Sequence, residues 1–133
     1  MPVLIERIRP NFLWNKPHFT NLVTSEGGKT LHLSGLVSAT IEGELVAPGD
    51  LSAQMAYVYD TIRRSLKLGG ATPADVVGQR VFVVDLKPSD RPAIMKAMMD
   101  FYGDDKSASS TCVGVSALLL KGALVEIDVT AVV

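Results

Sequence analysis

The sequence predicts an α+β domain, in which one mixed sheet carries two helices on one face and leaves its other face bare. Three observations lead to this prediction: two apolar stripes with helical spacing, several runs that alternate with the period of a strand, and their order along the chain, ββαβαββ. The 133 residues contain no internal repeat or linker, so we expect one domain over residues 1–133.

The first two strands are expected at 21–24 and 29–35, and we interpret them as a hairpin around the glycine-rich turn at 26–28. The proline-containing opening before them is expected to be irregular. Residues 40–49 are predicted to form a loop with a turn of its own.

The first helix is expected to begin after Asp50, because an aspartate side chain caps the free N–H groups of a helix start. Gly69 and Gly70 supply its end. Its apolar residues recur at spacings of three and four and so form one stripe: Leu51, Met55, Val58, Ile62 and Leu66.

A β-branched run at 76–85 predicts a largely buried strand, and the segment 88–92, with a proline at each end, opens the second helix. The apolar side of this helix holds Ile94, Met95, Met98, Met99 and Tyr102, and Gly103 lies near its end. Methionines can form an adaptable binding surface, but we interpret this stripe as ordinary core packing. Residues 104–108 are polar and predict a loop.

Two alternating runs at 109–115 and 124–131 close the sequence, and we expect them to be neighbouring strands. Cys112 shares a face of the first run with Ser110, and Glu126 points away from the apolar residues of the second. We expect Cys112 and Glu126 to lie on the sheet face that the helices do not cover. Small side chains there would let another copy of the chain pack closely, so a homo-oligomer is expected.

Composition argues against several classes of protein. A net charge of -1 does not suit binding to nucleic acid, and no apolar stretch is long enough to cross a membrane. The single cysteine cannot form an internal disulfide, and no Cys or His cluster has the spacing of metal ligands. The paired glycines mark turns rather than phosphate loops, and the charged opening is unlike a signal peptide. We therefore expect a cytoplasmic protein without metal or cofactor.

Five segments carry a resemblance to a known family. They are Leu33-Ser34-Gly35-Leu36, Pro48-Gly49-Asp50, Leu66 to Ala71, Val81 to Leu86, and Leu124 to Ala131. In order and spacing they resemble the RidA/YjgF family, formerly called endoribonuclease L-PSP. The resemblance implies a chorismate-mutase-like fold, a homotrimer whose sheets form a central barrel, and three clefts between adjacent subunits. It also implies hydrolysis of reactive enamines and imines to ketoacids and ammonia.

The resemblance further implies roles for single residues. Glu126 falls on the family's cleft carboxylate, which positions or activates water. Cys112 and Gly35 fall where backbone groups approach the ligand. Phe19 corresponds to an aromatic residue of the early loop, and His18 stands beside it.

One position departs from the family pattern. Deaminating members carry an arginine two residues before the cysteine, where its planar fork clamps the substrate carboxylate, and this chain has Ser110. We therefore expect substrates other than 2-aminoacrylate, with Ser110 among the residues that contact them. Lys106, Arg80 and His18 are candidates for supplying a cation from elsewhere, although none occupies the family position.

Three functions remain open at this point. The first is deamination of a larger unsaturated amino acid, of the 2-aminomuconate kind, with Glu126 handling the water. The second is a non-catalytic trimer that binds a small metabolite in the same clefts, which Ser110 favours. The third is a ribonuclease. It is the weakest of the three, because the chain has no basic run to contact phosphates.

Each candidate residue also has a structural interpretation. Glu126 is either a catalytic group, a solvated strand carboxylate, or one half of an interfacial ion pair with Arg80 or a lysine, and we favour catalysis. For Cys112 we favour a small packed residue, since nothing in the sequence lowers its pKa. His32 is expected to be exposed or interfacial rather than catalytic. For His18, a binding role and a structural role are equally open.

Overall fold

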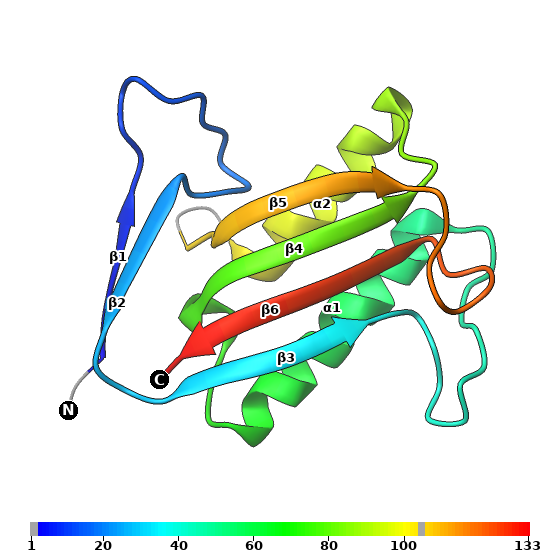
Figure 1. The fold of residues 1–133 in the computed structure, drawn as a ribbon, viewed down its shortest axis with the longest axis horizontal. Helices are drawn as coiled ribbons and strands as arrows, with labels where there is room; N and C mark the ends of the chain where they lie inside the picture. The colour runs from blue at the N-terminus through cyan, green and yellow to red at the C-terminus, as the bar shows by residue number, and fades with distance from the viewer. Residues whose placement is uncertain (1–2, 104–105) are drawn as a thin grey trace.

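In the computed structural model, which describes residues 3–103 and 106–133, two helices cover one face of a four-stranded sheet (Figure 1). The strands are β3 (Thr30–Leu36), β4 (Val76–Val84), β5 (Ser109–Val115) and β6 (Val125–Val132), in the order β3-β6-β4-β5. Pairing is antiparallel except between β4 and β5. The α+β class, the mixed sheet and the bare second face are confirmed.

Helix α1 (Leu51–Leu68) forms where the apolar stripe predicts it. The Asp50 side chain accepts a hydrogen bond of 3.0 Å from the backbone N–H of Ala53 and so caps the first turn. The helix ends at Gly69, where an added Cβ would collide with the side chain of Leu31 on β3. A glycine at this position therefore lets the helix end approach the sheet.

Helix α2 (Arg91–Tyr102) follows a short 3-10 turn at Pro88–Asp90. Ile94, Met98 and Tyr102 are buried as the stripe predicts, whereas Met95 and Met99 are only partly buried. The loop expected at 104–108 lies partly outside the described residues, and its described part, 106–108, is neither helix nor strand. No helix within the described chain is long and apolar enough to cross a membrane.

The core lies between the helices and the covered face of the sheet. Residues of α1, β4 and β6 contribute most of it, and the central members are fully or almost fully buried: Met55, Val58, Ile62, Leu66, Val81, Val83, Ile127 and Val129. Because these residues come from the predicted helical stripe and from alternate strand positions, the periodicity of the sequence correctly indicates the core.

The predicted hairpin of the second and third strands is wrong. β2 (Leu22–Glu26) pairs instead with β1 (Leu4–Ile8). β1 lies in the opening segment that we expected to be irregular. These two strands form a separate ribbon beside the end of the main sheet (Figure 1). After the glycine turn, Val133 donates its N–H to the carbonyl of Lys29 at 2.9 Å, which ties the start of β3 to the end of β6.

Candidate functional site

The predicted site residues lie in two groups on opposite faces of the sheet. Cys112 pairs with Val81 of β4, and residues paired in this way point to the same face, which here is the face covered by the helices. Glu126 pairs with Phe82 and points to the bare face. The expectation that Cys112 and Glu126 share the bare face is therefore wrong.

The expectation that their strands are neighbours is also wrong, because β4 lies between β5 and β6. The alternation of β5 is correct, but its faces are reversed: Val113 lies on the bare face with 40% of its surface exposed, while the smaller residues face the helices. Larger residues usually mark the covered face, but β5 is an edge strand, and beside it a cavity takes the place of tight packing.

That cavity, of about 720 Å³, lies between the start of β5, helix α2 and the loop that precedes β2. The loop contributes aromatic and polar residues, the helix contributes apolar residues and a cation, and β5 contributes two small residues. Its main lining residues are Trp14, His18, Phe19, Asn21, Lys87, Arg91, Ile94, Met95, Met98, Ser110 and Cys112. Four of the predicted residues, His18, Phe19, Ser110 and Cys112, are thus brought together here.

Hydrogen bonds from Arg9 hold the aromatic loop in place. Its guanidinium donates to the carbonyl of Lys16 at 2.8 Å and to the hydroxyl of Ser107 at 2.8 Å. The rings of Trp14 and Phe19 pack at 5.6 Å between centroids, and the His18 ring meets Phe19 edge to face at 5.1 Å. The loop therefore presents an aromatic wall to the cavity.

A buried hydrogen-bond network holds Ser110. The Gln79 side-chain oxygen accepts from the hydroxyls of Tyr59 at 2.7 Å and Tyr102 at 2.8 Å, and its amide nitrogen donates to the Ser110 hydroxyl oxygen at 3.0 Å. Burial raises the pKa of both tyrosines, so both remain neutral donors. Because the Ser110 oxygen accepts from Gln79, its own hydrogen is left to bond elsewhere.

His18 and Cys112 are both neutral at pH 7. Burial, together with the charges of Arg91, Lys16 and Arg9, lowers the pKa of His18 below its usual value of 6.5. Its Nδ1 atom is buried and has no hydrogen-bond partner among the described residues. Burial raises the pKa of the Cys112 thiol, which makes this sulfur a poor nucleophile.

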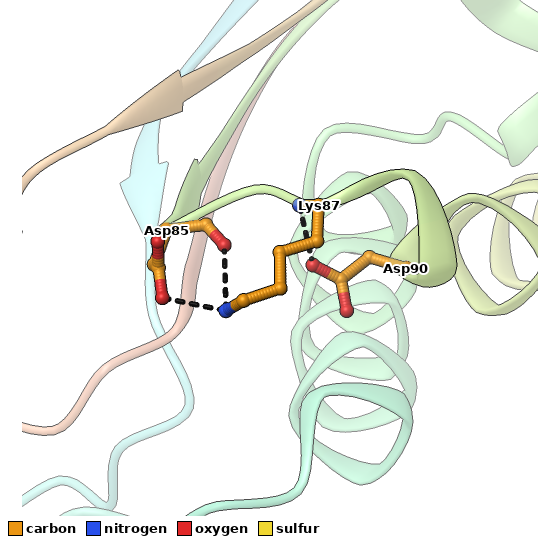
Figure 2. A network of polar contacts seen from close by, with 3 residues as sticks. All are labelled: Asp85, Lys87 and Asp90. Atoms are coloured by element: carbon orange, nitrogen blue, oxygen red, sulfur yellow. Dashed lines mark hydrogen bonds and ion pairs between the residues drawn. The ribbon is translucent and has the colours of Figure 1, made fainter.

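Lys87 lines the cavity, but its charge is already matched. Figure 2 shows its ammonium group turned to Asp85, whose carboxylate lies 2.6 Å away. Its backbone N–H donates to the Asp90 carboxylate at 2.9 Å, which closes the turn before α2. Lys87 therefore fixes the turn rather than offering a free cation to the cavity.

The second group lies on the bare face, where β3 passes β6. A Cβ added to Gly35 would lie 2.5 Å from the Oε2 atom of Glu126, so the missing side chain lets the carboxylate lie against the β3 backbone. Arg80 pairs with Asp128 through contacts of 2.9 and 3.1 Å. The alternative pairing of Glu126 with Arg80 is therefore not formed, and Glu126 has no ion pair within the described chain.

Residues 16–133 match the family described as Endoribonuclease L-PSP. The chain belongs to this family, which is the RidA/YjgF or Rid family. It is 30% identical over 97 residues to the 3-aminoacrylate deaminase RutC of Acinetobacter baylyi, an alignment covering 73% of this chain and 74% of that protein.

Solved structures of Rid proteins share the fold. The Rid protein YyfB of Yersinia pestis, a protein of unknown function, is 37% identical with a TM-score of 0.88 over 97% of this chain and 98% of its own. RidA of the Antarctic bacterium Psychrobacter sp. PAMC 21119 is 26% identical with a TM-score of 0.70, covering 86% and 88% of the two chains.

Of the three cations suggested by the sequence of this Rid protein, only His18 lines the cavity, and it is neutral. Arg80 is paired on the bare face, and Lys106 is not among the lining residues. The residue that sequence reasoning missed is Arg91, the first residue of α2. Nowhere in the described chain do three His, Cys, Asp or Glu side chains come together to hold a metal ion.

Proposed function

We propose that this Rid protein hydrolyses enamine or imine intermediates to ketoacids and ammonia, with Glu126 as the catalytic residue. The observation that carries the proposal is the position of Glu126: an unpaired carboxylate held against Gly35 in a family to which the chain belongs. A relative at 30% identity, named a 3-aminoacrylate deaminase, supports the same class of reaction.

The proposed reaction needs no cofactor. Protonation of the enamine at its β-carbon gives the imine, and water then adds to the C=N carbon to form a carbinolamine. Loss of ammonia with formation of the C=O bond yields the ketoacid, so one water is consumed for each ammonia released. Glu126 would take a proton from the attacking water and return it to the departing nitrogen.

We further propose that the complete site lies between copies of the chain in a homotrimer. Within one chain, Glu126 and Gly35 lie on the bare face, whereas Ser110 and Cys112 line the cavity on the helix side. A cleft that uses both groups therefore takes one from each of two chains. The exposed Val113 on the bare face supports association, since burying apolar surface drives it.

The proposed substrate is larger than 2-aminoacrylate. Ser110 stands where deaminating relatives hold an arginine, so a small substrate would lose its main anchor there. The cavity of about 720 Å³ has room for a longer unsaturated chain, of the 2-aminomuconate kind, beside its aromatic wall.

The test is ammonia release from freshly generated 2-aminoacrylate and 2-aminomuconate. We expect Glu126→Gln to lower the rate roughly 100-fold or more, because a general acid/base contributes about that much. Glu42→Gln, which alters an exposed loop carboxylate, is the matched control and should leave the rate unchanged. Full activity in Glu126→Gln would contradict the assignment.

A non-catalytic trimer that binds a small metabolite is the second candidate, and Ser110 is the observation that favours it. It predicts saturable binding in the same clefts without release of ammonia from any enamine offered. A ribonuclease finds no support, because a chain of net charge -1 lacks the positive field that RNA binding needs.

A further inference from the structure

We propose that Arg91, at the start of α2, is the anchor for a ligand carboxylate in the cavity beside β5. It would act from a different element than the arginine that Ser110 replaces. The ligand class is an anionic acid with an extended apolar or unsaturated chain. Where that acid is an enamine or imine, the inference rests on the proposed function, but the binding site itself does not.

The charges of the cavity favour an anion. Its described lining contains two cations, Lys87 and Arg91, and no carboxylate. Lys87 forms an ion pair with Asp85 at 2.6 Å, whereas Arg91 makes no ion pair or side-chain hydrogen bond among the described residues. Its guanidinium carbon lies 5.8 Å from the centroid of the Trp14 ring, which holds it at the cavity wall. An anion in this cavity therefore meets one guanidinium that has no ion-pair partner in the described chain.

One neutral polar group of the cavity, the Ser110 hydroxyl, has a hydrogen free for a ligand. The Ser110 oxygen accepts from Gln79, so its hydrogen is available to a ligand oxygen. The Nδ1 atom of His18 and the Oδ1 atom of Asn21 are buried without a hydrogen-bond partner in the described chain. Both atoms are closed off from solvent, so a ligand in the cavity would bond to the Ser110 hydroxyl rather than to them.

The remaining lining indicates the other end of the ligand. Trp14 and Phe19 form the aromatic wall, and Met95 and Met98 face it from α2. The volume of about 720 Å³ is within the range of pockets for small organic ligands and far exceeds a three-carbon acid. A carboxylate at Arg91 would thus place the apolar chain of the ligand along this wall. The cavity volume suits a chain of roughly four or more carbons.

Calorimetric titration of the full-length protein tests the inference. The probes are 4-methyl-2-oxopentanoate, which has both a carboxylate and an apolar chain, pyruvate, which lacks the chain, and 4-methylpentanamide, which lacks the charge. We expect the first to bind most tightly. Arg91→Ala should weaken it about 10- to 100-fold, and Arg91→Lys should weaken it less, because a charge remains without the planar fork. Affinity for the amide should stay unchanged.

Arg64→Ala is the matched control, because Arg64 is an exposed arginine of α1 outside the cavity lining. Arg91 is itself exposed, so its variants should fold, and the unfolding midpoint checks this. Unchanged affinity of Arg91→Ala for the ketoacid, or no binding by the wild type at millimolar concentration, would overturn the inference. Binding through Arg91 without ammonia release would contradict only the proposed function, and ammonia release with Arg91 irrelevant would contradict only this inference.

Discussion

At the residue scale, the absence of a side chain at Gly35 determines where the Glu126 carboxylate lies. The end of a glutamate is flexible, so a methyl group 2.5 Å from Oε2 would displace the carboxylate without disturbing the backbone. A side chain added at Gly35 should therefore affect the reaction rate more than the free energy of unfolding. Its neighbour Ser34 lies on the same exposed stretch of β3 and makes a suitable control.

We predict that Gly35→Ala lowers the rate of ammonia release about tenfold or more, because small misplacements of a catalytic group are costly. The free energy of unfolding should change by less than about 1 kcal/mol, since the displaced atoms can swing into solvent. Ser34→Ala should alter neither quantity. A rate loss matched by a large loss of stability would show that Gly35 acts on folding instead.

A site residue could be predicted from the sequence where a short segment around it is enough to identify it. Glu126 and Gly35 stand in short segments that resemble the family, and the structure brings them together. Arg91 carries no such signal, because its place at the cavity depends on which face of β5 turns toward α2. The pairing of β5 with β4 decides which face of β5 turns toward α2. The alternation of residues in β5 does not reveal that pairing.

At the element scale, the helices follow from local chemistry. The apolar stripe of α1 and its cap at Asp50 are both present in the sequence, and both form as expected. The hairpin of β2 and β3 was mispredicted because a glycine turn between two strands looks the same whether the strands pair with each other or with distant partners. Strand pairing is set by contacts far apart in the sequence.

We predict that Asp50→Ala lowers the free energy of unfolding by about 1 kcal/mol, because the N–H of Ala53 loses its acceptor. Ser52→Ala, which changes the second residue of α1, should have a much smaller effect. Urea unfolding followed by far-ultraviolet circular dichroism measures both. Equal effects of the two substitutions would show that the cap contributes nothing specific.

At the scale of the whole molecule, the two groups of site residues lie on opposite faces of one sheet. Composition and periodicity indicated the bare face and the need for a partner, but they placed Cys112 and Glu126 together on it. The structure separates them, and this separation is the reason that we propose a cleft built from two copies rather than a site within one chain.

Complementation between two inactive variants tests this claim most directly. Glu126→Gln and Arg91→Ala each damage one group, and both should release ammonia slowly at low substrate concentration. In trimers assembled from equal amounts of the two, each cleft draws Glu126 from one chain and Arg91 from its neighbour, so about a quarter of the clefts are intact. We therefore predict that the mixed trimers release ammonia at about a quarter of the wild-type rate. A mixture no more active than the separate variants would contradict the shared site.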